Sequence, residues 1–286
     1  STPDRNTTHY WYDLLGRLVL SQNARQKTAS DYTYTRYDEL GRAIETGRAH
    51  RNISLTFGYD KVWNQAHFET WLEDSTTRYE VTRSYYDDLI PNISSTQLLG
   101  YFGSSGQQNL RNRIASVTYE DTWDGVDTTY NSATHYSYDI AGNVSRIVQD
   151  VPELVAVHQR YKRVEYDYDQ ISGKVNYVYY QRDSLDQFMH HYVYDADNRL
   201  QFAETSPNGL LWERDANYEY YLHGPLVRTE LGERRVQGLD YAYTLQGWLK
   251  GVNSGAIMLN STVTGNFATV DMGRDGKSGN TGDWAR

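Results

Sequence analysis

Residues 12–18, with the sequence YDLLGRL, decide the fold because the same pattern recurs along the chain. It returns as YDELGRAI at 37–44 and as YDIAGNV at 138–144. A copy at 168–175, YDQISGKV, has one extra residue before its glycine, and YDADNRL at 194–200 has asparagine at the glycine position. Self-similarity at a spacing of this size indicates that each copy belongs to one supersecondary unit.

The residues around each copy predict a β-hairpin. Tyrosines alternate with other residues before the motif, as in YTY at 32–34 and YVY at 192–194, and short β-branched runs such as VSRIV at 144–148 follow it. Gly and Asn share the ability to adopt positive φ, so their common position predicts a turn. The aspartate suits an Asx turn, and the following arginine is placed to lie across a neighbouring tyrosine ring.

We interpret the motif residues as architectural, and we assign no catalytic, cofactor-binding or metal-binding role to any residue. The structural repeat residues are Tyr12, Asp13, Gly16, Arg17, Tyr37, Asp38, Gly41, Arg42, Tyr138, Asp139, Gly142, Tyr168, Asp169, Gly173, Tyr194, Asp195, Asn198 and Arg199.

Composition excludes several classes of protein. The 286 residues include 28 Lys and Arg against 37 Asp and Glu, a net charge of −9, and no cysteine. An acidic chain argues against nucleic-acid binding, and the lack of cysteine rules out disulfides, zinc ribbons and iron–sulfur clusters. The 27 tyrosines, with a hydrophobic content of only 38%, indicate that tyrosine takes over part of the core from aliphatic residues. Aromatic content of 14% argues against disorder.

The chain is expected to be organised as one repeat segment with a tail. We assign residues 1–250 to the repeats, with degenerate copies across 45–137 and a loop insertion at 91–112, and residues 251–286 to a loop-rich excursion. Residues 62–72, VWNQAHFETWL, fit either a helix or a pair of strands, and we favour strands with Trp63, Phe68 and Trp71 packed inward. No apolar run is long enough to span a bilayer, and the first residues do not resemble a signal peptide.

The patterns that suggest catalytic or ligand-binding sites are incomplete in this sequence. His190 and His191 are adjacent in a predicted strand, so they should face opposite sides and cannot share a metal. The other histidines considered, His9, His135 and His223, have no histidine neighbour in sequence. Residues 276–278, GKS, resemble the end of a P-loop, but Asp271 stands where its first glycine belongs. A calcium loop starting at Asp271 would need glutamate where Gly282 stands.

The motif closely resembles the YD repeat of Rhs proteins, the C components of Tc insecticidal toxins, and teneurins. Two later segments, 220–232 and 238–250, are similar to the end of the repeat region in large exported proteins of the Bacteroidetes. The resemblance implies a long antiparallel sheet that spirals into part of a hollow shell around a C-terminal toxin domain. The Asp-Pro-x-Gly self-cleavage signature found in many such shells is absent here, and we therefore expect a fragment of a larger polypeptide.

Two functions follow as expectations. The first is a non-enzymatic, cofactor-free segment of a secreted or cell-surface shell, whose partners are the rest of its polypeptide, an enclosed toxin or effector, and an outer-membrane secretion machine. The second is an adhesin or carbohydrate-binding module that uses exposed aromatic rings. The tryptophans that distinguish the two are Trp11, Trp63, Trp71, Trp123, Trp212 and Trp248.

Overall fold

The computed structural model describes residues 7–51, 62–63, 65–73, 77–90, 95–123, 125 and 129–253, and the chain forms two compact units. These units are Ser1–Arg163 and Val164–Arg286. Residues 52–61 of the predicted degenerate repeats, the side chain of Trp63 and most of the predicted loop-rich tail lie outside the described residues.

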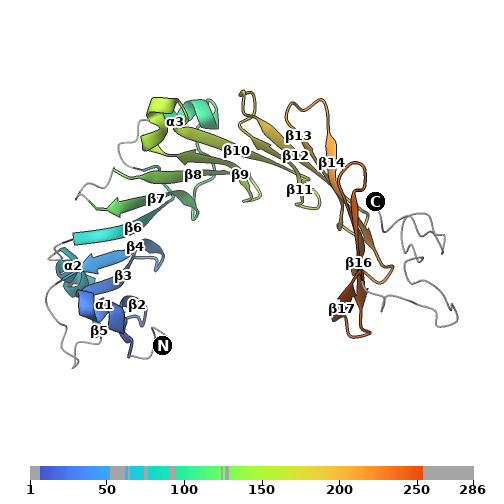
Figure 1. Ribbon diagram of the computed structural model, residues 1–286. Coiled ribbons are helices and arrows are strands. Elements are labelled where there is room, and N and C mark those ends of the chain that lie inside the picture. Colours follow the sequence, from blue (N-terminus) through green and yellow to red (C-terminus); the bar gives the residue numbers. More distant parts are fainter. Residues whose placement is uncertain are drawn as a thin grey trace. The chain divides into compact units, whose positions relative to one another are not determined.

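The first unit is a sheet of hairpins with short helices between some of its strands (Figure 1). All its described strand pairings are antiparallel except that of β1 with β5. Its strands are β1 (His9–Asp13), β2 (Leu18–Gln22), β3 (Asp31–Tyr37), β4 (Ala43–His50), β5 (Val62–Trp63), β6 (Thr77–Tyr86), β7 (Ile114–Thr122), β8 (Ser132–Tyr138) and β9 (Val144–Asp150). Its helices are α1 (Ala24–Ala29), α2 (Gln65–Glu73), α3 (Ser95–Phe102) and the 3₁₀ helix η2 (Pro152–Val157).

The second unit is an antiparallel meander, in which each strand pairs with the next along the chain. Strand β10 (Tyr161–Tyr168) spans the boundary and pairs with β11 through residues 164–168. The remaining strands are β11 (Val175–Tyr180), β12 (Phe188–Tyr194), β13 (Leu200–Ser206), β14 (Glu213–Tyr220), β15 (Leu226–Leu231), β16 (Gln237–Tyr243) and β17 (Leu249–Val252).

One hairpin geometry recurs in both units. In eight hairpins of the described residues, a tyrosine at or next to the end of the first strand pairs with the first residue of the return strand, next to a shift in register. Such a shift marks a bulge that bends and twists the strand. The pairs are Tyr12 with Leu18, Tyr37 with Ala43, Tyr86 with Ile114, Tyr138 with Val144, Tyr168 with Val175, Tyr194 with Leu200, Tyr220 with Leu226, and Tyr243 with Leu249.

The turn after the tyrosine has the backbone that the sequence predicts. The Asp13 N–H donates to the Arg17 carbonyl at 2.9 Å, the Gly16 N–H donates to the Asp13 carbonyl at 3.0 Å, and Gly16 has φ +77°. Asn198, which replaces the glycine in its own copy, has φ +61°. The same two bonds close the turns at 221–225 and 244–248, where no aspartate is present. The sequence motif alone did not identify these two turns as members of the set.

The insertion lies inside a turn of this kind. The Asp87 N–H donates to the Arg113 carbonyl at 3.1 Å, as Asp13 does to Arg17, so residues 88–112 replace a short turn. The prediction of a surface loop at 91–112 was wrong in part, because the segment contains helix α3. Leu98 and Phe102, one helical turn apart, are buried against Val148 of β9.

The preference for strands at 62–72 was also wrong, since Gln65–Glu73 forms helix α2. Phe68, Trp71 and Leu72 follow the three-to-four-residue spacing of a buried helix face and join the core of the first unit. Trp71 meets Tyr32 of β3 edge to face, with ring centroids 5.2 Å apart. Helical spacing places Phe68, Trp71 and Leu72 on one face. The packing of this face, with Trp71 against Tyr32, favours the helix over the pair of strands that we predicted.

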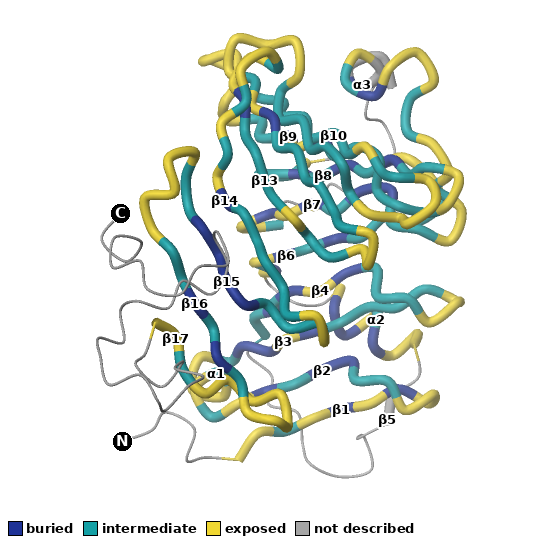
Figure 2. The backbone as a smooth tube through the Cα atoms, turned by 90° about the vertical axis from the view of Figure 1, so that its right-hand side faces the viewer, coloured by how far each residue is buried: buried dark blue, intermediate teal, exposed yellow. Residues whose placement is uncertain are grey.

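Burial differs between the units (Figure 2). In the first, an apolar cluster lies between α2 and strands β1–β4, with Leu20 and Tyr34 fully buried. In the second, strands β11–β14 consist mostly of half-buried residues on both faces.

The hairpins of both units confirm the all-β antiparallel hairpin fold predicted from the sequence. Among the described residues, none of the helices has the length and apolar character needed to cross a bilayer.

We expect Gly16→Val to lower the free energy of unfolding by about 1–3 kcal/mol, because a β-branched residue resists positive φ. A Cβ at this position would meet no atom within 4 Å, so the cost arises from the backbone alone. Gly16→Asn should cost clearly less, since Asn198 already occupies the equivalent position. Urea denaturation of both variants is the measurement. Equal stabilities would contradict the requirement for positive φ.

Candidate functional site

The turn aspartate holds both the backbone and the arginine of its hairpin. Oδ1 of Asp13 accepts the N–H groups of Leu15 and Arg17 at 2.9 and 2.8 Å, and Oδ2 accepts Arg17 Nε at 2.6 Å. Partial burial raises the pKa of Asp13, but the bonds from Arg17 and Leu15 outweigh it and leave the pKa below its usual value. The carboxylate is therefore charged and fully engaged near neutral pH.

The other predicted turns repeat this arrangement with variations. Asp38 and Asp195 bind Arg42 and Arg199 as Asp13 binds Arg17. The amide of Asn143 takes the place of the guanidinium beside Asp139. At Asp169, where the turn is one residue longer, Oδ1 accepts the N–H groups of Ile171 and Ser172.

Each cation also reaches the next hairpin. Arg17 lies over the ring of Tyr37 at 4.6 Å, and the Tyr37 hydroxyl donates to the Leu18 carbonyl of the preceding hairpin at 3.0 Å. Neighbouring turns are thus joined by a cation–π contact and a hydrogen bond. The further cation–tyrosine pairs are Arg42 with Tyr86, Arg113 with Tyr138, Lys174 with Tyr194, and Arg199 with Tyr220. The matching hydroxyl bonds run from Tyr86 to Ala43, Tyr138 to Ile114, Tyr194 to Val175, and Tyr220 to Leu200.

The predicted repeat residues are therefore brought together within each turn, and five pairs of neighbouring turns are linked by a cation and a tyrosine. They form rows along the hairpins of each unit and not one common pocket. Every aspartate of the predicted set accepts bonds from its own turn, so its carboxylate acts in folding.

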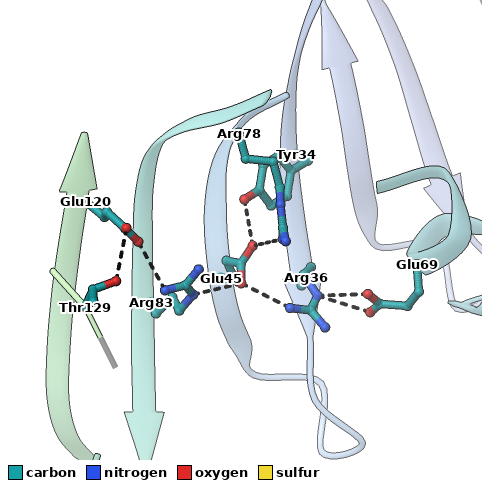
Figure 3. A network of polar contacts seen from close by, with 8 residues as sticks. All are labelled: Tyr34, Arg36, Glu45, Glu69, Arg78, Arg83, Glu120 and Thr129. Atoms are coloured by element: carbon teal, nitrogen blue, oxygen red, sulfur yellow. Dashed lines mark hydrogen bonds and ion pairs between the residues drawn. The ribbon is translucent and has the colours of Figure 1, made fainter. Parts of the chain in front are cut away.

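A buried charge network that sequence reasoning missed centres on Glu45 of β4 (Figure 3). Its carboxylate forms ion pairs with Arg36, Arg78 and Arg83 at 3.0–3.1 Å and accepts the Tyr34 hydroxyl at 2.6 Å. Glu45 itself is only 4% exposed. Two further carboxylates balance the three arginines: Arg36 also pairs with Glu69 of α2 at 3.0 Å, and Arg83 with Glu120 of β7 at 3.4 Å.

Burial and charge act in opposite directions on Glu45. Burial raises its pKa, but the Tyr34 hydroxyl and the three arginines outweigh this and lower it below the usual value. Burial and the adjacent Glu45 carboxylate raise the pKa of Tyr34, so its hydroxyl remains a donor. Tyr34 fits because it crosses Gly47 on the next strand: a Cβ there would lie 2.9 Å from the tyrosine oxygen.

A bulge explains why sequence alternation did not reveal this network. Arg78 and Arg83 are five residues apart, which in a regular strand places them on opposite faces. Glu80 between them has φ +53°, and the pairing of β4 with β6 shifts there, so both arginines reach Glu45. The available signal was the presence of several charged residues within predicted strands, of which only the tyrosines were used for the prediction.

The second unit has a smaller counterpart. Arg228 of β15 pairs with Glu230 at 3.3 Å and with Asp240 of β16 at 2.8 Å, and all three residues are at most 3% exposed. Arg235 reaches the second oxygen of Glu230 at 3.2 Å. Buried ion pairs thus occur within the sheet of each unit.

The histidines occupy different settings. His191 stacks on Tyr177 at 4.3 Å, while His190 contacts Phe188 and Tyr192, so the two rings lie on opposite faces as predicted. His135 of β8 is fully buried, with Nδ1 2.8 Å from Ser116 Oγ on β7. Among the described residues, no three His, Cys, Asp or Glu side chains are grouped as metal ligands would be.

The tryptophans are distributed between core and surface. Trp11 and Trp71 are buried, Trp123 and Trp212 are half-buried, and Trp248 is 74% exposed. Trp123 lies against the guanidinium of Arg78, 3.1 Å from the ring centroid, and so belongs to the Glu45 network.

Comparison with known proteins finds similarity in structure only. The fold matches crystal structures of TcdB2-TccC3 and TcdB2-TccC3-Cdc42, each with a TM-score of 0.53 and 14% identity over 87% of this chain. A third, TcdB2-TccC3 without its hypervariable C-terminal region, gives a TM-score of 0.54 at 13% identity over 87% of this chain. No protein-family model matches the sequence, and neither does any curated protein.

At this identity the comparison shows the fold: the chain is folded like part of these Tc toxin chains. It spans 10% of the length of each of the three solved chains.

We expect Glu45→Gln to reduce the free energy of unfolding by about 3–5 kcal/mol, because the buried Arg78 and Arg83 and the half-buried Arg36 lose their common counter-charge. Glu39→Gln, in an exposed turn position, is the matched control and should change stability by less than about 0.5 kcal/mol. Urea denaturation followed by tyrosine and tryptophan fluorescence measures both variants. A Glu45→Gln protein as stable as the control would show that the network contributes no stability.

We expect His135 to make the fold sensitive to acid. Burial lowers its pKa from 6.5 to about 4, with Arg160 acting in the same direction and Asp150 against it. Between about pH 6.5 and 4 the unfolded chain therefore binds a proton at this histidine that the folded chain does not bind. The free energy of unfolding falls as the pH drops through this range, by roughly 3 kcal/mol at most. Denaturation curves across this range should be flatter for His135→Gln than for the parent chain. Equal slopes would contradict a buried neutral histidine.

Proposed function

We propose that this chain is a structural segment of an Rhs-type YD-repeat protein and forms part of a wall that encloses or carries a C-terminal toxin or effector domain. The observation that carries the proposal is the interlocked hairpin, in which the turn aspartate binds its arginine and the cation stacks on the tyrosine of the next turn. The similarity of fold to TcdB2-TccC3 supports it.

This linkage between neighbouring turns is suited to a wall, because each hairpin contacts mainly the hairpins next to it. A sheet built this way extends by adding units, as repeat proteins do. Its turns are tied together by Arg17 and Tyr37 and their equivalents. The role is mechanical and not enzymatic, and in keeping with it the motif aspartates are engaged by their own turns.

The proposal includes a larger polypeptide. The chain spans a tenth of the solved chains that it matches, and one of these, TcdB2-TccC3, was solved without its hypervariable C-terminal region. We place the enclosed domain outside the present sequence, in a protein exported to the cell surface or beyond by an outer-membrane secretion machine.

One observation favours the alternative of an adhesive or carbohydrate-binding surface. Trp248 is largely exposed, and Tyr177, His191 and Trp212 form an aromatic cluster on one face of the second unit. Rings arranged this way are suited to stacking on sugars. The burial of Trp11 and Trp71 favours the wall.

Cryo-electron microscopy of the whole polypeptide to which this segment belongs tests the proposal. We expect a hollow sheet with additional density inside, next to these hairpins, and a C-terminal region that resists protease until the wall is opened with denaturant. The matched control is the same polypeptide truncated before its C-terminal region, which should give an empty interior. A solid core with outward aromatic rings, and glycan binding lost in Trp248→Ala, would overturn the wall in favour of adhesion.

A further inference from the structure

A cavity of about 310 Å³ lies in the first unit, between helix α3 with its following loop and the face of the sheet. Most of its wall is apolar, contributed by Leu89, Ile90, Leu98, Phe102 and Leu110. A space of this size is well above the roughly 150 Å³ that holds benzene in an apolar protein cavity. It accommodates a molecule with one or two rings.

His135 lines this cavity and brings to it a buried polar atom that lacks a partner. The residue is fully buried, its Nδ1 is engaged by Ser116 Oγ at 2.8 Å, and Nε2 has no hydrogen-bond partner in the described part of the chain. Ser116 stands directly opposite His135 on the neighbouring strand, so the ring is held in one orientation. A buried nitrogen left without a partner destabilises the fold, and a ligand that bonds to it would remove this cost.

Two other polar side chains of the wall, those of Gln107 and Asp87, are already occupied. The Gln107 amide donates to the carbonyls of Ala115 and Tyr136 at 2.7 and 2.8 Å. Asp87 accepts from Arg42 and from the Asn112 backbone N–H. Among the described residues of this wall, His135 Nε2 is thus the buried side-chain atom that lacks a hydrogen-bond partner.

We infer that the cavity binds a small, uncharged aromatic molecule that carries one N–H or O–H group, with its ring among the apolar side chains and its polar group on His135 Nε2. This site is separate from the proposed wall function, since it needs neither an enclosed domain nor a longer polypeptide. A neutral imidazole accepts from such a group or donates to it, depending on its tautomer.

Phenol and toluene, which have nearly the same shape and differ in the hydroxyl, test the inference on the 286-residue chain. With histidine rings labelled by ¹⁵N, phenol should shift the Nε2 resonance of His135 saturably and leave His190 unchanged. Phenol should also bind about five- to tenfold more tightly than toluene, the ratio expected for one hydrogen bond. Equal binding of the two probes, or no saturable shift at His135, would overturn the inference and leave water as the occupant.

Variants locate the interaction. His135→Phe keeps a ring in place and removes the nitrogen, so the affinity for phenol should fall to that for toluene while toluene binding persists. His190→Phe, on the second unit, is the matched control and should bind both probes like the parent chain. Leu98→Trp should fill the cavity and abolish both. If His135→Phe does not fold, the comparison of phenol with toluene in the parent chain still tests whether the hydroxyl contributes to binding. Undiminished phenol binding by folded His135→Phe or by Leu98→Trp would overturn the site.

Discussion

The carboxylate of the turn aspartate is the interaction on which the order of the sheet depends. By accepting the N–H of Arg17 on Oδ1 and its Nε on Oδ2, Asp13 fixes the residue at which the return strand begins. A slip of one residue would exchange the two faces of that strand. The faces differ here, because in the first unit one of them carries the buried Glu45 network. The turns at 221–225 and 244–248 keep the backbone bonds without aspartate, so glycine supplies the shape and aspartate reinforces it.

The Glu45 network explains how a chain with 38% hydrophobic residues builds a buried face. Three arginines and three glutamates replace aliphatic side chains, and Tyr34 joins them to the apolar cluster. Buried ion pairs add little net stability over apolar packing, but an unmatched partner is very costly. Strand pairings that separate Glu45 from its arginines are therefore penalised, and the network favours a single register across β3, β4, β6 and β7.

Much of the fold follows from the sequence, and the exceptions have physical causes. The period of two and the shared Gly or Asn position predicted the hairpins and their positive φ, as Gly16 and Asn198 show. The bulge at Glu80 was hidden because a single residue in an unusual conformation leaves no periodic signal. Helix α2 was misread although Phe68, Trp71 and Leu72 follow helical spacing, because the helix has only nine residues and lies among strands, and its packing on Tyr32 decides the outcome. The insertion at 88–112 separates the two halves of one turn, which removes the spacing that identifies the motif.

The second unit shows why tyrosine is preferred to leucine in such a sheet. Its strands β11–β14 are half-buried on both faces, and no helix among the described residues of this unit covers them. A leucine face would need a second layer to exclude water, whereas a tyrosine ring packs on its neighbours and leaves its hydroxyl hydrated. Rings do stack along these strands, as Tyr177 does on Tyr179 at 5.7 Å and on His191 at 4.3 Å. Lateral stacking thus takes the place of a covering layer, and a sheet stabilised in this way keeps both of its faces partly exposed.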